Sequence, residues 1–127
     1  MSDYPDDLKY TSSHEWIRVE GDEATVGITD HAQSQLGDLV YVELPMIEDE
    51  VFAGKEASVV ESVKTAADVY SPLTGMITAI NEKLTAEPEI INQDPYGEGW
   101  LFKVKMQDES ELDDFLTAEE YSQEIED

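Results

Sequence analysis

The sequence predicts a mainly β protein with a short internal helix and helices near its C-terminal end. Apolar and β-branched residues alternate with polar ones over several short stretches, which is typical of half-buried strands. Glycine and proline residues lie mostly between these stretches, where they indicate turns. The 127 residues are enough to bury one hydrophobic core, so we expect a single domain over residues 1–127.

The first part of the chain predicts a hairpin followed by a helix. Residues 14–28 contain two alternating apolar stretches on either side of an acidic turn, which predicts two antiparallel strands. Thr29 or Asp30 can cap a short helix that ends near Leu36. Gly37 follows at the position where helices often end in a residue with positive φ.

The middle of the chain predicts a second hairpin. A short strand at residues 40–44 ends at a proline, and the acidic segment 48–54 resembles a surface loop. Two β-prone stretches then make up a hairpin at about residues 57–70. Lys64 interrupts the β-prone pattern and is therefore expected near the tip of this hairpin.

The second half predicts two further strands. A strand at residues 76–80 is followed by a polar connection and a turn cluster at 94–99. The last strand is expected at residues 100–106, with lysines on its polar face. Its apolar face should carry Trp100, Phe102, Val104 and Met106.

A helical cap is expected at about residues 109–125. Leu112, Phe115 and Leu116 have helical spacing, which places one helix before residue 117. Thr117 and Glu120 match a capping box, which predicts the start of a final helix.

The charge composition excludes two classes of partner. Seven basic residues stand against 31 acidic ones, so the formal net charge is −24. Nucleic acids and anionic membranes would be repelled by such a surface. The acidic residues are spread along the whole chain, which suggests a halophilic prokaryote whose high-salt cytoplasm screens their repulsion. No signal peptide and no apolar run of about 20 residues is apparent, so we expect a cytoplasmic protein without a membrane segment.

The common catalytic motifs are missing from the sequence. Without cysteine the chain has no disulfide, thiolate metal site or thiol nucleophile of its own. His14 and His31 do not form an HExxH arrangement and are expected in surface or capping roles. An acid–base pair of His14 with Glu15 is disfavoured, because adjacent strand residues point to opposite faces. No GxSxG elbow, phosphate-binding loop or EF-hand spacing is present.

Several long motifs, in order, resemble one protein family. The segment ESVKTAADVYSPLTG at residues 61–75 resembles the lipoyl-attachment hairpin of glycine cleavage system H proteins. YTSSHEW at 10–16 resembles the opening signature of that family, and VGITDHAQSQLGDLVYVELP at 26–45 resembles its central block. NQDPYGEGWLFKVK at 92–105 resembles the closing block, so the resemblance covers about residues 8–121.

The resemblance implies a barrel-sandwich hybrid of the lipoyl/biotinyl type and a carrier that is not itself an enzyme. In the family, lipoate is amide-linked to the lysine that matches Lys64, where a lipoylating enzyme attaches it. The lipoyl group takes the aminomethyl group of glycine from glycine decarboxylase, a pyridoxal phosphate enzyme. A tetrahydrofolate-dependent aminomethyltransferase unloads it, and dihydrolipoyl dehydrogenase reoxidises the dithiol. We expect a monomer with no metal site.

The resemblance also implies site residues around this lysine. Glu61 and Val63 match positions that the lipoylating enzyme recognises. Glu15 or Asp68 is expected to bind the aminomethyl ammonium, and the role of Gln35 stays open because some members have histidine there. A cleft that shelters the arm is expected to be lined by Ser13, Glu15, Ile28, Ala32, Leu36 and Asp68.

Four alternatives remain at this stage. A biotin carrier usually has methionine beside the modified lysine, whereas Val63 and Thr65 flank Lys64 here. Lipoyl domains of 2-oxo-acid dehydrogenases are shorter and usually belong to longer multidomain chains. An H-like protein could instead relay lipoate to other apoproteins. An adaptor would leave Lys64 unmodified.

Overall fold

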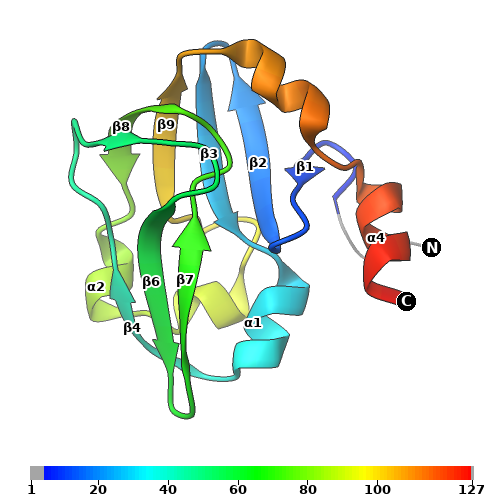
Figure 1. Ribbon diagram of the computed structural model, residues 1–127. Helices are drawn as coiled ribbons and strands as arrows, with labels where there is room; N and C mark the ends of the chain where they lie inside the picture. The colour runs from blue at the N-terminus through cyan, green and yellow to red at the C-terminus, as the bar shows by residue number, and fades with distance from the viewer. Residues whose placement is uncertain (1–4, 127) are drawn as a thin grey trace.

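The computed structural model describes residues 5–126 and has two β-sheets with short helices around them (Figure 1). The larger sheet has the strand order β1-β2-β3-β9-β8-β5, and the smaller sheet has the order β4-β6-β7. Every pairing in both sheets is antiparallel. The predicted mainly β class is therefore confirmed.

The elements are short, as the spacing of turn residues in the sequence predicts. The strands of the described part are β1 (Lys9–Tyr10), β2 (Glu15–Glu20), β3 (Glu23–Ile28), β4 (Leu39–Glu43), β5 (Glu50–Val51), β6 (Glu56–Ser62), β7 (Ala66–Tyr70), β8 (Gly75–Ile80) and β9 (Phe102–Met106). The helices are α1 (Asp30–Leu36), α2 (Lys83–Ala86), α3 (Ile90–Gln93), the 3-10 helix η1 (Glu109–Asp114) and α4 (Ala118–Glu126).

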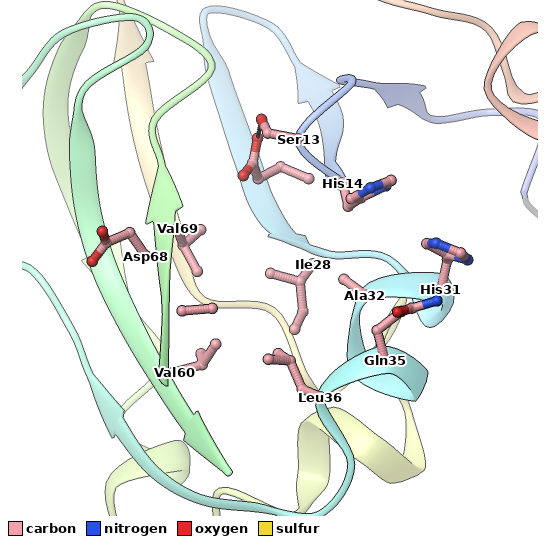
Figure 2. Close-up of a pocket in the computed structure, with 12 residues that line it drawn as sticks. Ser13, His14, Ile28, His31, Ala32, Gln35, Leu36, Val60, Asp68 and Val69 are labelled. Carbon is pink, nitrogen blue, oxygen red and sulfur yellow. Dashed lines mark hydrogen bonds between the residues drawn. The ribbon is translucent and has the colours of Figure 1, made fainter. Parts of the chain in front are cut away.

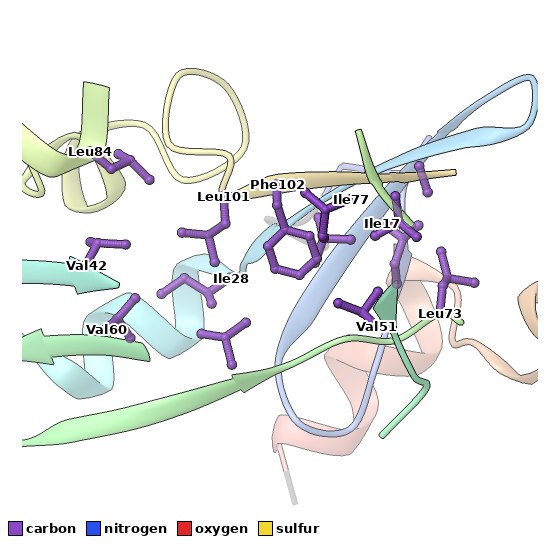
Figure 3. Packing of buried hydrophobic residues seen from close by; sticks show 14 of the residues in the cluster. Ile17, Ile28, Val42, Val51, Val60, Leu73, Ile77, Leu84, Leu101 and Phe102 are labelled. Carbon is purple, nitrogen blue, oxygen red and sulfur yellow. The ribbon is translucent and has the colours of Figure 1, made fainter. Parts of the chain in front are cut away.

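The main core lies between the two sheets (Figure 3). Alternating residues of β3, β8 and β9 supply Val26, Ile77 and Phe102, all of which are fully buried. Val60 of β6 and Val69 of β7 close the core from the smaller sheet. Burial of a side chain of this size contributes about 1.5–3 kcal/mol, so the sandwich depends on the alternation seen in the sequence.

A second apolar cluster joins the two ends of the described chain. Its buried members are Leu8, Tyr10, Trp16, Ala118 and Tyr121. Trp16 lies directly across from Gly27 in the β2–β3 pair, and a Cβ at Gly27 would come within 2.6 Å of the indole ring. Only glycine therefore allows this tryptophan to lie flat on β3.

The predicted helix signals are confirmed at both caps. Thr29 is the N-cap of α1, where its hydroxyl accepts a hydrogen bond from the N–H of Ala32 at 3.2 Å. Gly37 follows α1 with a φ of 85°. Before α4, the N–H of Glu120 donates to the Thr117 hydroxyl, and the N–H of Thr117 donates to the Glu120 carboxylate.

The last strand begins later than expected, and the helix before residue 117 ends earlier than its apolar spacing suggests. β9 begins at Phe102, and Trp100 is half-buried outside it, packed against the second cluster. The carbonyl of Trp100 accepts from the side-chain amide of Asn81 rather than from a neighbouring strand. Helical spacing at 112–116 also misleads, because η1 ends at Asp114 and Leu116 pairs with Tyr10 as a β-bridge.

Three short elements were not anticipated in the polar connections. Helices α2 and α3 span only four residues each, which is too short for an apolar period to be visible. The acidic loop at 48–54 contains the two-residue strand β5, which pairs with β8. These elements bury Leu84, Ile91 and Val51 against the main core.

Candidate functional site

The β6–β7 hairpin projects from the body of the molecule, beside α1 (Figure 1). Residues 63–65 form its turn, and the Lys64 side chain is exposed there. The hydroxyl of buried Ser62 organises this turn, because it accepts from the N–H groups of Lys64 and Thr65 at 3.3 and 3.1 Å. The N–H of Ser62 donates to the carbonyl of Thr65 at 2.7 Å. A short, closed turn thus holds the base of the lysine in a fixed position.

The segment after α1 supports the tip of this hairpin. The N–H of Val63 donates to the carbonyl of Asp38 at 3.2 Å. A Cβ at Gly37 would lie 3.5 Å from Cε of Lys64, so the aliphatic part of the lysine passes along this glycine. Gly37 has φ 85° and ψ −159°, a conformation open essentially to glycine alone.

Asn92 of α3 also holds this segment in place, although it lies more than fifty residues later in the chain. Its side-chain amide N–H groups donate to the carbonyl of Gly37 and to the side chain of Gln33, both at 2.9 Å. Its side-chain oxygen Oδ1 accepts from the N–H of Leu39, also at 2.9 Å. One side chain therefore satisfies backbone groups that the end of α1 would otherwise leave unpaired.

A cavity of about 310 Å³ opens between α1, the β6–β7 hairpin and the start of β2 (Figure 2). Its walls are largely apolar, and they come from segments far apart in the sequence. The residues that line it are Ser13, His14, Glu15, Ile28, His31, Ala32, Gln35, Leu36, Val60, Ala67, Asp68 and Val69. All six positions expected for the cleft are among them.

Glu15 is the buried carboxylate of this cavity, with only 2% of its surface exposed. Its Oε1 accepts hydrogen bonds from the hydroxyls of Ser13 at 2.6 Å and Thr11 at 2.7 Å. Burial raises the pKa of Glu15, while these two hydroxyls and the backbone N–H of Tyr70 act to lower it. Three donors thus orient the carboxylate: two hydroxyls from the turn before β2 and one backbone N–H at the end of β7.

Asp68 differs from Glu15 although both line the cavity. Its neighbours in β7, Ala67 and Val69, turn their side chains towards the cavity, and side chains alternate along a strand. The carboxylate of Asp68 is exposed and points away from the cavity in Figure 2. Of the two acids, the geometry favours Glu15 as the one that could bind a cationic group inside.

The two histidines occupy a different place from the one the sequence suggests. His14 precedes β2 with a positive φ of 72°, so strand alternation does not separate it from Glu15, and both line the cavity. The rings of His14 and His31 lie 4.9 Å apart. Nδ1 of His14 is 2.6 Å from the hydroxyl of Tyr121. No group of three or more potential metal ligands occurs among residues 5–126.

Several residues at this site were missed in the sequence. Ala67 and Val69 carry a period-two signal that could have assigned them to the inner face of the hairpin. Ser62, Asn92 and Tyr121 act through contacts with distant segments or with a turn, for which the sequence offers no periodic signal. Gln35 is exposed and lies at the edge of the cavity.

No helix in the part of the chain that the structure describes is both long enough and apolar enough to cross a membrane.

Taken together, the two sheets and the exposed hairpin define a domain of the lipoyl-type barrel-sandwich class. The family model for glycine cleavage H-protein matches residues 8–127. The chain therefore belongs to the glycine cleavage H-protein family.

Curated and solved relatives agree with this assignment. The chain is 58% identical over 126 residues to the glycine cleavage system H protein of Pseudoalteromonas translucida, with 98% of each chain covered. It is 58% identical over 127 residues to the protein of that name from Coxiella burnetii, with 99% of this chain and 98% of the relative covered. A crystal structure of a glycine cleavage system H protein from Mycobacterium marinum superposes with a TM-score of 0.90 at 40% identity, covering 97% and 99% of the two chains. These sources do not support the expectation of a halophilic origin.

Proposed function

We propose that this protein is the lipoylated carrier of a glycine cleavage system, and that residues 1–127 form a single carrier domain with Lys64 as the attachment point. The observation that carries the proposal is the closed hairpin tip, which exposes Lys64 on the same hairpin that forms one wall of a largely apolar cavity with one buried carboxylate. A modifying enzyme needs a lysine amine that stands clear of the protein body in a defined geometry. Family membership supports the same assignment.

The residues present fit a lipoyl group on Lys64. The Lys64 side chain is exposed at the tip, and the cavity offers aliphatic side chains from three elements, namely Ile28, Leu36 and Val60. When bound, the lipoyl group supplies a pair of thiol sulfurs, which this cysteine-free chain lacks, for redox chemistry and for carrying the aminomethyl group of glycine.

Within this proposal the cavity residues shelter a cationic amine from water. Glu15 is the group that binds it, because its carboxylate is buried and already oriented by Ser13 and Thr11. A charge-assisted hydrogen bond of this kind contributes about 1.5–3 kcal/mol. Ala32 and Leu36 narrow the cavity from the side of α1 and exclude water.

Recognition by a lipoylating enzyme is proposed to involve Glu61 and Val63. Val63 is 73% exposed, so its aliphatic side chain is accessible to a modifying enzyme. Glu61 lies two residues before Val63 near the end of β6, and its side chain is half-buried. An exposed apolar side chain directly before Lys64 and an acidic group three residues before it distinguish Lys64 from other exposed lysines such as Lys55.

The carrier itself performs no catalysis in this proposal. It receives the aminomethyl group from a pyridoxal phosphate glycine decarboxylase and delivers it to a tetrahydrofolate-dependent aminomethyltransferase. Dihydrolipoyl dehydrogenase then restores the disulfide of the cofactor. We place it in the cytoplasm as a monomer, where tethering keeps the transferred group at high local concentration for each enzyme in turn.

Intact-mass analysis of protein from its native host tests the attachment. The expected result is one lipoyl amide, located at Lys64 by peptide mapping. Lys64→Arg should lose both the adduct and glycine cleavage with purified partner enzymes, while Lys55→Arg, at another exposed lysine, should lose neither. An adduct that persists in Lys64→Arg contradicts the site. Lipoylated protein that transfers lipoate but supports no aminomethyl transfer would indicate the relay function instead.

A further inference from the structure

Tyr121 of the C-terminal helix contacts a residue that lines the cavity, His14. Tyr121 is fully buried in α4, and its ring stacks on that of Tyr10 with centroids 5.0 Å apart. Its hydroxyl lies 2.6 Å from Nδ1 of His14 and 2.8 Å from Oγ1 of Thr29. One oxygen atom thus contacts two segments that are separate in the sequence.

These two segments lead into adjacent walls of the cavity. His14 belongs to the turn that carries Ser13 and Glu15, and Thr29 is the N-cap of α1. The walls are joined directly as well, because the N–H of Thr29 donates to the carbonyl of His14 at 3.1 Å. The spacing between the buried carboxylate and α1 is therefore set at the point where Tyr121 binds.

One proton arrangement satisfies all three side chains. Oγ1 of Thr29 accepts from the N–H of Ala32, and its own proton can be donated to the oxygen of Tyr121. In this arrangement the hydroxyl of Tyr121 donates to Nδ1 of His14. A nitrogen that accepts in this way carries no proton, so the proton of a neutral imidazole lies on Nε2.

We propose that Tyr121 is a positioning residue, which joins α4 to both walls of the cavity and holds His14 as the neutral Nε2–H tautomer. Protonation of His14 would put a second donor at Nδ1 and reverse the chain of hydrogen bonds. The Thr29 hydroxyl would then have to find another acceptor. The chain therefore favours the neutral ring.

The surroundings of His14 also favour the neutral ring, because on balance they lower its pKa. Burial lowers the pKa of His14, and His31 on α1 lowers it further by repulsion, whereas Glu124 on α4 raises it. Glu15, the next residue along, lies in the same cavity, and its carboxyl takes its hydrogen bonds from hydroxyls and a backbone N–H. Near neutral pH the buried carboxyl of Glu15 thus has no imidazolium beside it at His14.

This arrangement deepens the proposed function and rests on it for its purpose. A cationic amine held at Glu15 would be repelled by a protonated His14 in the same cavity. A neutral His14 avoids that competition. Retention of the amine should therefore weaken as the pH falls through the pKa of His14.

The test uses the unmodified protein, labelled with 15N, and follows the histidine rings by two-bond N–H correlation spectra across a pH titration. The expected spectrum shows His14 as the Nε2–H tautomer. In Tyr121→Phe, which keeps the stacked ring and loses the hydroxyl, the pKa of His14 should rise by about half a pH unit or more. Tyr96→Phe is the matched control, because the Tyr96 hydroxyl accepts from the N–H of Asp30 at the start of α1. It should leave His14 unchanged.

An Nδ1–H tautomer in the parent protein, or an unchanged His14 pKa in Tyr121→Phe, would overturn the inference. If Tyr121→Phe does not fold, Thr29→Ser and Thr29→Val give the same comparison, since only serine keeps the hydroxyl. The pH profile of amine retention on the lipoylated protein should then shift with the pKa of His14. A protein without lipoate on Lys64 would refute the proposed function and leave the tautomer result standing.

Discussion

Replacement of Gly37 by alanine tests how the hairpin tip is held. Gly37 has φ 85° and ψ −159°, and a side chain there costs about 1–3 kcal/mol of backbone strain. A chain of 127 residues has an unfolding entropy at which 1 kcal/mol corresponds to about 4 °C, so the melting temperature should fall by about 4–12 °C. The added methyl group would meet Lys64 only at 3.5 Å, which is ordinary contact.

The strain in Gly37→Ala should also affect modification of Lys64. If the backbone relaxes towards negative φ, the carbonyl of Asp38 moves and the N–H of Val63 loses its acceptor. Loss of one hydrogen bond, worth about 0.5–1.5 kcal/mol, corresponds to a rate between about twofold and tenfold lower if the enzyme must restore the tip. The assay is the initial rate of lipoylation of the apoprotein with a lipoate ligase, lipoate and ATP, measured well below the melting temperature.

Gly21→Ala is the matched control for this experiment. Gly21 also has positive φ, 65°, and a methyl group there would meet no atom within 4 Å. It lies in the β2–β3 turn, away from Lys64, so this variant should lose stability but keep the parent rate of lipoylation. Equal lipoylation rates in the two variants would refute the claim that the segment after α1 supports the tip.

Four further outcomes are expected. Glu15→Ala should speed the loss of ammonia from loaded protein by about tenfold or more, whereas Asp68→Asn should change it little, as ammonia assays would show. Raising the pH through the raised pKa of Glu15 removes a proton that the native state holds and the unfolded chain has already lost. Stability should fall across that window, and denaturation of Glu15→Gln should lack this component. Asn92→Ala should cost about 2–3 kcal/mol by denaturant titration, because it leaves the N–H of buried Leu39 unpaired. The melting temperature of the parent should rise between dilute buffer and molar salt, since screening relieves the repulsion of a net charge of −24.

Local sequence signals predicted the parts of the fold that depend on local physics. Alternation placed Ala24, Val26 and Ile28 on one buried face, and cap residues placed the starts of α1 and α4. Each of these signals depends on residues within four positions of one another. They need no knowledge of which segments meet.

The errors arise where distant contacts override local preference. Trp100 continues the alternating pattern of β9, but its carbonyl accepts a hydrogen bond from the Asn81 side chain and its ring packs against the second cluster. His14 looks like a strand residue, yet its positive φ places it beside Glu15 in the cavity. Asn92 joins α3 to a segment more than fifty residues earlier, through hydrogen bonds to Leu39 and Gly37. No pattern in a single sequence reports such pairings.

The bridge between Tyr10 and Leu116 has a consequence for biosynthesis. Tyr121, whose ring stacks on that of Tyr10, emerges from the ribosome more than a hundred residues after Tyr10. At about 5–20 residues per second, the nascent chain exposes Tyr10 and Trp16 for roughly 5–20 seconds before α4 is available. The six-stranded sheet likewise cannot be completed before β9 is synthesised, because β9 lies between β3 and β8. Folding of this domain is therefore completed only after β9 and α4 have been synthesised.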